Sequence, residues 1–323
     1  MSEMSMGKLP AGVFPSAWVL ARTQGMERET WLDLRRRGIG GSDAAAIVGL
    51  NPWSSPYEVW SDKCGLLPPK EETEAMRLGN ALEEYVAKRF AEETGKRVRR
   101  YPYMLCSERY PWALADIDRR IVGENAGLEC KTTRIHGTGK RGYPDYYYCQ
   151  CQHYMATVGA DRWYLAIINM ADSTFTWHVI ERSDEDIAVL MAAEDLMMQR
   201  VRQKSPPPMD GSDATTDALG SIYSDARPGM RISLAHRAPS IDEIVALRAD
   251  KKAIEQREKQ LIQEIKLDMR DAEEAEIGSR ARVTWKAQER RSIDIDAMIR
   301  AGIDVSPYIS VSKTRTFKIV ERS

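Results

Sequence analysis

Residues 112–133 read Trp112-Ala-Leu-Ala-Asp-Ile-Asp118-Arg-Arg-Ile-Val-Gly-Glu-Asn-Ala-Gly-Leu-Glu129-Cys-Lys131-Thr-Thr133. Apolar runs flank the turn-forming residues 123–127, and this pattern predicts a hairpin of two short strands. Alternate side chains of a strand share a face, so Glu129 and Lys131 should point the same way. Asp118, on the neighbouring strand, should then meet both side chains.

Two carboxylates and a lysine brought together are the minimum set for metal-dependent hydrolysis of phosphodiesters. Mg²⁺ prefers oxygen ligands and keeps several waters, so Asp118, Glu129 and the backbone carbonyl of Cys130 would hold the ion. Lys131 would orient the attacking water or offset charge that develops on the phosphate. The bare pattern is a weak indication, because 29% of the residues are charged and an ordinary surface hairpin could show the same set.

Three further blocks accompany this hairpin along the chain. They are residues 37–49 (Arg-Gly-Ile-Gly-Gly-Ser-Asp-Ala-Ala-Ala-Ile-Val-Gly), residues 79–84 (Gly-Asn-Ala-Leu-Glu-Glu) and residues 144–155 (Pro-x-x-Tyr-x-x-Gln-x-Gln-His-Tyr-Met). With these blocks, about residues 29–209 resemble the YqaJ viral recombinase family, a lambda-exonuclease-type branch of the PD-(D/E)xK nucleases. Asp116 departs from the family pattern, which usually has a small residue there, and it would be either a second ligand or a decoy.

The resemblance implies a restriction-endonuclease-like α/β fold, in which a mixed central sheet is flanked by helices. It also implies a Mg²⁺-dependent DNA exonuclease that degrades the 5′ strand of duplex DNA and leaves 3′ overhangs for strand annealing. We expect two metal ions, with Mn²⁺ able to substitute. Relatives act on DNA ends with a single-strand annealing protein and some form a ring of three subunits, so a homo-oligomer is expected here too.

Two other functions remain open at this point. One is a structure-specific DNA endonuclease, which would cut closed circular DNA. The other is a catalytically inactive DNA-end binding protein, although the complete Asp-Glu-x-Lys set argues against it.

The resemblance assigns roles to two more polar residues. Glu83 would be a helical acid that faces the metal, whereas its position beside the apolar stripe predicts an exposed charge. Gln150 would fix the catalytic lysine or a phosphate oxygen, whereas glutamines on helices are usually exposed to solvent. Partners of this kind tune the ligands of a metal site.

The net charge of −1 is unusual for a DNA-binding protein, so local basic clusters matter. Arg35, Arg36 and Arg37 precede a glycine turn that opens a helix at Ser42. Arginines and the amides of a helix N-terminus together favour phosphate. The resemblance implies that this pocket receives the 5′-terminal phosphate.

More cations follow elsewhere. Arg134, Lys140 and Arg141 come after the catalytic strand and predict DNA contact. For residues 96–100, DNA contact and a solvated face are equally supported.

The pattern along the chain predicts four parts: an N-terminal arm (1–28), a nuclease domain (29–209), a linker (210–240) and a C-terminal region (241–323). Helices are expected at 30–37, 42–48, 55–64, 76–94, 143–159 and 184–203, and strands at 163–169 and 174–179. A long charged helix should cover 241–275, as a marginal coiled coil or laid against the nuclease body. Residues 281–286 and 312–320 should form a final strand pair.

The five cysteines are an odd set without Cys-x-x-Cys spacing, which argues against a disulfide framework and a zinc site. No apolar run approaches the length of a membrane span, and the N-terminus lacks a signal-peptide pattern. We therefore expect a cytoplasmic protein without a membrane partner. The family resemblance implies a phage or prophage protein that acts in the bacterial host cell.

Overall fold

The computed structural model describes residues 7–8, 14–69, 71–134, 141–289, 293–309 and 319. The chain divides into two compact units, Met1–Tyr223 and Ser224–Ser323. The first unit therefore extends past the nuclease boundary expected at residue 209. It does so because helix α7 (Asp213–Ile222) packs on α3 (Pro56–Lys63) through buried Ala218, and Thr215 donates to the Ser55 hydroxyl at 2.8 Å.

The N-terminal part also differs from the loosely held arm expected at residues 1–28. Strand β2 (Ala17–Arg22) pairs with β5 (Tyr103–Ser107), and β1 (Gly7–Lys8) pairs with β2. Phe14 is 1% exposed and stacks on Trp163. The segment from Phe14 onward is therefore part of the core.

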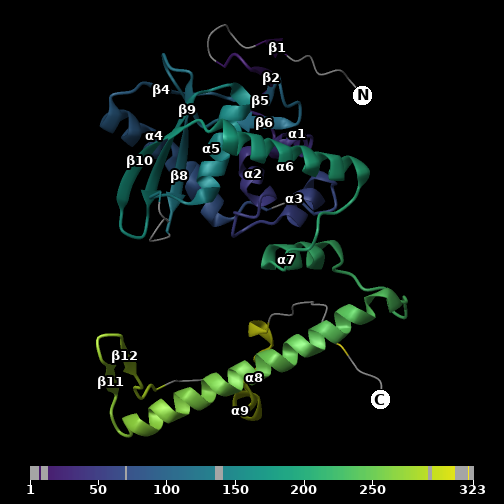
Figure 1. Cartoon of the computed structure of the whole chain (residues 1–323), viewed down its shortest axis with the longest axis vertical. Helices are drawn as coiled ribbons and strands as arrows, with labels where there is room; N and C mark the ends of the chain where they lie inside the picture. Colours follow the sequence, from purple (N-terminus) through teal and green to yellow (C-terminus); the bar gives the residue numbers. More distant parts are fainter. Residues whose placement is uncertain are drawn as a thin grey trace. The chain divides into compact units, whose positions relative to one another are not determined.

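The strands of the first unit form two five-stranded sheets within the described residues (Figure 1). The first has the order β1-β2-β5-β6-β3 and adds β6 (Ala113–Asp116) and β3 (Ile39–Gly40). The second has the order β10-β9-β8-β7-β4, with bounds Thr174–Glu181, Arg162–Asn169, Ala126–Thr133, Arg119–Ile121 and Val98–Arg100. Both sheets are mixed, because β3–β6 and β8–β9 are parallel and the other pairs antiparallel.

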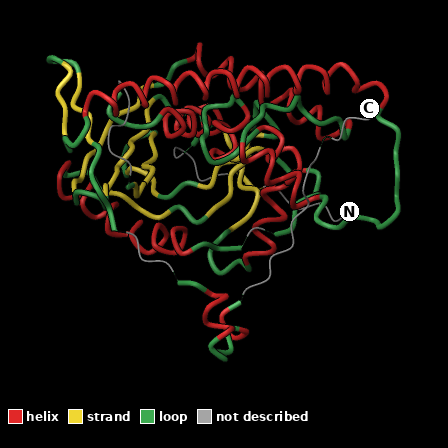
Figure 2. Tube along the Cα trace, turned by 90° about the horizontal axis from the view of Figure 1, so that it is seen from below, coloured by secondary structure: helices red, strands yellow, loops and turns green. Residues whose placement is uncertain are grey.

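Helices cover both faces of the second sheet, as the alternation along β9 shows. Trp163, Leu165 and Ile167 join the core cluster beneath α5 (Asp145–Val158). Tyr164 and Ala166 point the other way, into the cluster with α4 (Glu74–Thr94). In Figure 2 the strands of this unit run beside one another among helical segments. The predicted fold class, a mixed α/β core flanked by helices, is confirmed.

Most predicted elements of the first unit are found within a few residues. Helices α1 (Arg28–Arg36), α2 (Gly41–Ile47) and α6 (Asp184–Gln203) complete the set. α4 begins after its N-cap Thr73 and ends at Gly95, which has a φ of 70°. None of the helices within the described residues has the length and apolar character to cross a bilayer.

The second unit has the predicted long helix and a small hairpin, but their details correct the prediction. Helix α8 (Ala238–Met269) ends before residue 275, and β11 (Glu274–Ile277) pairs with β12 (Ala281–Thr284). The strand expected at 281–286 was predicted to pair with residues 312–320, but it pairs with β11, which directly precedes it in the chain. A hairpin between neighbouring strands closes only a short loop, which costs little entropy. The other expected strand, 312–320, lies outside the described residues except for residue 319.

The packing of β8 on β9 predicts a sharp difference between two glycines. A Cβ at Gly127 would lie 2.1 Å from the ring of Trp163, whereas a Cβ at Gly220 in α7 would meet nothing within 4 Å. Gly127→Ala should lower the free energy of unfolding by about 1–3 kcal/mol through overpacking. Gly220→Ala, the matched control, should raise it by about 0.5–1 kcal/mol because alanine favours a helix. Chemical denaturation followed by circular dichroism measures both; equal effects would contradict this packing.

Candidate active site

The hairpin brings Glu129 and Lys131 together on one face of β8. Lys131 Nζ lies 2.6 Å from Glu129 Oε1, and Gln150 of α5 donates to the same oxygen at 2.6 Å. The Glu129 side chain is only 3% exposed. Its second oxygen, Oε2, is buried and has no hydrogen-bond partner among the described residues. The carboxylate is therefore fixed in place with one oxygen still available.

Asp118 lies where the chain passes from one sheet to the other, between β6 and β7. β7 pairs with β8 only as far as Leu128, so the next residues of β8 lack a strand on that side. Asp118 fills the position, because its Oδ2 accepts a hydrogen bond from the Cys130 amide at 2.8 Å. In an extended strand the N–H and C=O of one residue face the same edge. The Cys130 carbonyl therefore faces the side on which Asp118 lies.

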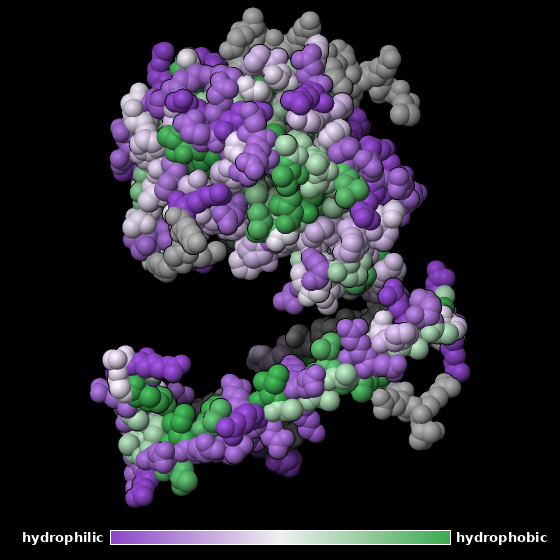
Figure 3. Space-filling view, in the orientation of Figure 1, coloured by the Kyte–Doolittle hydropathy of each residue, from purple (hydrophilic) through white to green (hydrophobic). Residues whose placement is uncertain are grey.

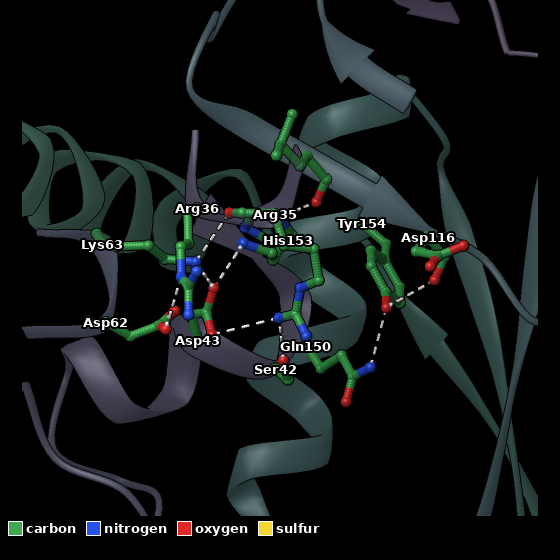
Figure 4. Close-up of polar contacts among 12 residues, drawn as sticks. Arg35, Arg36, Ser42, Asp43, Asp62, Lys63, Asp116, Gln150, His153 and Tyr154 are labelled. Atoms are coloured by element: carbon green, nitrogen blue, oxygen red, sulfur yellow. Dashed lines mark hydrogen bonds and ion pairs between the residues drawn. The ribbon is translucent and has the colours of Figure 1, made fainter. Parts of the chain in front are cut away.

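Asp116 is held differently from Asp118. Its Oδ2 accepts from the Trp31 indole at 2.7 Å. Its backbone oxygen accepts from the Tyr154 hydroxyl at 3.0 Å (Figure 4). The Tyr154 hydroxyl in turn accepts from Gln150 at 3.0 Å. Asp116 thus lines a cavity whose wall also contains Asp118 and Glu129, and its carboxylate is hydrogen-bonded to Trp31.

Glu83 and Glu84 of α4 take different positions. Glu83 lines the cavity, whereas the Glu84 side chain is 65% exposed, and both form ion pairs with Arg119. Arg119 is 3% exposed and also donates to the backbone oxygen of Asp118 at 2.7 Å. This arginine therefore links the helical acid to the hairpin.

Burial and mutual repulsion disfavour the charged forms of the two hairpin acids. Burial, then the nearby Glu129 and Glu83 carboxylates, raise the pKa of Asp118 well above its usual value. Burial raises the pKa of Glu129 even though Lys131 opposes it. For Lys131, burial would lower the pKa, but Glu129 and Asp118 outweigh it and raise the pKa. The site thus holds excess negative charge with a protonated lysine beside it.

The donor chemistry of this centre fits a hard divalent cation. Asp118, Glu129 and Glu83 offer carboxylate oxygens, and the unpartnered Oε2 of Glu129 lacks a donor or a cation. However, no three His, Cys, Asp or Glu side chains gather at ligating distance among the residues described here. Arg119 and Lys131 explain this, because they engage the carboxylates of Glu83 and Glu129.

A cavity of about 430 Å³ opens beside these acids. Its basic wall contains Arg35, whose guanidinium donates to Ser42 at 2.6 Å and pairs with Asp43 at 3.3 Å. Lys63 also contacts Asp43, at 2.8 Å. Figure 4 shows Arg35 between Asp43 and Ser42.

Arg36, Arg37, Arg134 and Arg141 do not line this cavity, whereas Arg100, from the basic cluster at residues 96–100, does. Arg36 pairs with Asp33 and Asp62 instead, and Arg37 is not among the cavity-lining residues. Arg134 is exposed at the end of β8, and Arg141 lies over the Tyr148 ring at 4.1 Å. Lys140 lies outside the described residues.

The glycine turn is required by close packing. A Cβ at Gly41 would lie 2.7 Å from the Tyr154 ring and 2.9 Å from Gln150, and one at Gly40 would lie 3.0 Å from Arg35. These glycines therefore let α2 approach the residues that hold Glu129.

Several residues of the site were not found from the sequence. Trp31, Arg119 and Tyr154 each connect elements that are far apart along the chain, and single residues of these types give no local signal. Arg119 could have been noticed as a charge at an inward position of β7, where an apolar residue is expected.

A further polar pair lies behind β6. His153 contacts Glu194 through Nδ1 at 2.7 Å and the Leu114 oxygen through Nε2 at 2.9 Å, and both side chains are fully buried. Burial would lower the pKa of His153, but the Glu194 carboxylate outweighs it and raises the pKa. The pair anchors α6 to α5 and to the strand that leads to Asp116.

Comparisons with known proteins relate this chain to the YqaJ-like viral recombinases. A family model for the YqaJ-like viral recombinase domain matches residues 30–161. Protein YqaJ of Bacillus subtilis (strain 168), itself uncharacterised, is 36% identical over 310 residues, which are 94% of this chain and 96% of that protein. A match of this length extends over both units.

Solved structures show weaker similarity. The alkaline exonuclease LHK-Exo of Laribacter hongkongensis is 20% identical with a TM-score of 0.44, covering 55% of this chain and 94% of that chain. A phage-related exonuclease of Haemophilus somnus is 14% identical with a TM-score of 0.38, covering 54% and 100%.

The repulsion among buried acids predicts a stability change with pH. A carboxyl in the unfolded chain loses its proton near pH 4. The pKa of Asp118 is raised in the folded chain. The wild type should therefore lose stability as the pH rises from the pKa of this carboxyl in the unfolded chain to its pKa in the folded chain. Asp118→Asn, which can still accept a hydrogen bond from the Cys130 amide, should therefore melt several degrees higher than the wild type at pH 8. This difference in melting temperature should disappear near pH 4.

The exposed Glu84 provides the control. A hydrogen bond from Arg100 lowers its pKa, so Glu84→Gln should be neutral or slightly destabilising at pH 8. Thermal melts across the pH range measure both variants. An Asp118→Asn protein that is less stable at every pH would contradict the repulsion.

Proposed function

Because the chain belongs to the YqaJ-like viral recombinase family, we propose that it is a DNA exonuclease of phage-type recombination. It hydrolyses the 5′ strand of duplex DNA in a Mg²⁺-dependent reaction and leaves 3′ single-stranded overhangs for annealing. One observation carries the proposal. Glu129 is buried, fixed by Lys131 and Gln150 through one oxygen, and left without a partner at the other, beside Asp118.

Asp118, Glu129 and Glu83, with the Cys130 carbonyl, are the groups proposed to hold Mg²⁺. The family resemblance favours two ions, with Mn²⁺ as a substitute. When bound, the metal would lower the pKa of a water and withdraw charge from the phosphate. It would also compensate the excess negative charge that raises the pKa of Asp118.

Lys131 acts as a fixed cation in this proposal. Its raised pKa keeps it protonated at neutral pH, so it donates a hydrogen bond and does not remove a proton. It orients the water or offsets the developing charge on the phosphate. Gln150, bonded to Glu129 and Tyr154, keeps the carboxylate in position.

The basic wall of the cavity supports the proposed polarity. Hydrolysis joins the water oxygen to phosphorus and breaks the P–O3′ bond, which leaves a 5′ phosphate on the shortened strand. Arg35, Ser42 and the Gly41 amide are proposed to bind that phosphate. The Gly40 amide, which was also expected to contribute, already donates to Asp43 Oδ2 at 3.0 Å. Arg36 and Arg37, expected from the sequence to share this role, have no such support, because neither lines the cavity.

The proposed partners are duplex DNA ends, a single-strand annealing protein and further copies of the chain, in a ring if the family resemblance extends to assembly. The proposed place of action is the cytoplasm of a bacterial host. A structure-specific endonuclease is the main rival. Incubating end-labelled linear duplex and closed circles with Mg²⁺ separates them, because an exonuclease leaves the circles intact.

Removing the central residues should abolish cleavage while DNA binding survives. Asp118→Ala, Glu129→Ala and Lys131→Ala should each slow hydrolysis by roughly a hundred- to a thousandfold, through loss of transition-state stabilisation. Phosphate contacts elsewhere should maintain affinity. Asp116→Ala is the matched control and should reduce the rate less, because its carboxylate is engaged by Trp31.

Single-turnover rates on linear duplex, together with a gel-shift assay, measure these effects. Wild-type turnover by folded Lys131→Ala would refute the mechanism. A larger loss in Asp116→Ala than in Asp118→Ala would mean that the acids were assigned in the wrong order.

The terminal-phosphate assignment predicts different results for neighbouring arginines. Duplexes with a 5′ phosphate should be degraded faster than 5′-hydroxyl duplexes, and Arg35→Gln should shrink that preference by roughly tenfold. Arg36→Gln, which removes the same charge one residue away, should preserve the preference. Degradation rates on the 5′-phosphate and 5′-hydroxyl duplexes measure this preference. Equal rates for the wild type, or digestion from 3′ ends, would contradict the proposed polarity.

A further inference from the structure

Helix α8 carries an apolar stripe that its own unit does not cover. Leu247, Ile254 and Leu261 are 59%, 69% and 43% exposed. Within the described residues the C-terminal end of the helix is packed, where Met269 is 6% exposed and Lys266 lies over the Trp285 ring at 5.1 Å. Ile241 and Ile244, near the other end, are partly buried. Figure 3 shows hydrophobic side chains at several places along α8.

The stripe has the spacing of a coiled coil. Seven residues, which we call the α8 seam, follow one another at alternating intervals of three and four: Ile244, Leu247, Lys251, Ile254, Glu258, Leu261 and Ile265. Such spacing over three heptads keeps a narrow stripe facing one partner helix. Five of these positions are apolar, so the seam is suited to pairing with a helix of the same kind.

The two charged seam residues indicate the partner. In a parallel pair of α8 helices, Lys251 would lie beside Lys251 and Glu258 beside Glu258, which is unfavourable. Lys251 and Glu258 are equally far from the point between Ile254 and Glu255, near the middle of α8. In an antiparallel pair with its two-fold axis at this point, each lysine lies at the same level along the helix as the glutamate of the other copy, twice by symmetry.

We propose that α8 forms an antiparallel pair with α8 of a second copy of this chain. In this arrangement Ile244 of one copy lies at the same level as Ile265 of the other copy, so the apolar residues at the two ends of the α8 seam face each other. Within one helix Lys251 pairs with Glu255 at 3.7 Å, and both side chains are more than half exposed. Such a pair contributes little and can be exchanged for the contact between copies.

This pairing is independent of the proposed nuclease function, because every seam residue lies in the second unit. It is tested by the mass of the full-length chain in analytical ultracentrifugation. Replacing Leu247, Ile254 and Leu261 by Asp should halve the particle mass. The matched control places Asp at the three outward positions, Ala249, Gln256 and Gln263, and should leave the mass unchanged.

Charge exchange tests the orientation. Lys251→Glu should weaken self-association by at least about tenfold, and adding Glu258→Lys should restore it. Lys252→Glu makes the same charge change off the seam and should have no effect. In a parallel pair the double exchange would leave the same like-charge contacts as the wild type, so a loss followed by rescue is specific to the antiparallel arrangement.

Disulfide trapping gives a second measure. All five native cysteines lie in the first unit, so cysteines introduced into α8 are the only ones in the second. Mixed Ile244→Cys and Ile265→Cys chains should form a disulfide between the two variants, and each variant alone should not. A monomeric wild type, a mass insensitive to the seam, or disulfides within each single variant would overturn the proposal.

Discussion

The burial of the Glu129 carboxylate is the constraint on which the site depends. A buried carboxylate is costly unless cations or hydrogen-bond donors compensate it. Lys131 and Gln150 compensate one oxygen only. The fold therefore retains an unsatisfied acceptor next to a second, half-buried acid, Asp118, which is a costly arrangement that a bound cation would relieve. The unpartnered oxygen of Glu129 beside Asp118 thus both destabilises the fold and provides the proposed site for a metal ion.

The position of this site follows from the separation of the two sheets. Where β7 stops pairing with β8, the Cys130 amide needs an acceptor, and Asp118 supplies it from the link between sheets. The elements that close the site then come from helices: α5 provides Gln150, and α2 can approach because Gly41 has no side chain. One break in strand pairing thus fixes one acid at the edge of the cavity.

The sequence predicted what depends on local spacing. Glu129 and Lys131 were expected to share a face from the period of a strand, and the helix expected over 76–94 was expected to end at residue 94, as found. The direction of side chains from a short helix could not be obtained in this way: Arg35 faces the cavity and Arg36 faces Asp62.

Tertiary contacts account for the other differences. The Arg119–Glu83 pair and the Trp31–Asp116 bond join residues far apart in the chain, so no local pattern encodes them. The end of α8 was placed too late, because the helical pattern continues into residues that pair with β12 instead. Tertiary pairing overrides local propensity in such cases.

The net charge of −1 also becomes compatible with a DNA ligand once the local pairs are considered. Asp43 is ionised, because Lys63 and Arg35 outweigh the effect of burial and lower its pKa. Two cations therefore share one anion, and Lys63, with its side chain 2% exposed, supplies the compensation from inside. Arg35, at the cavity wall, keeps charge that is not cancelled. A buried lysine can in this way leave a surface arginine able to bind phosphate in a protein without a basic excess.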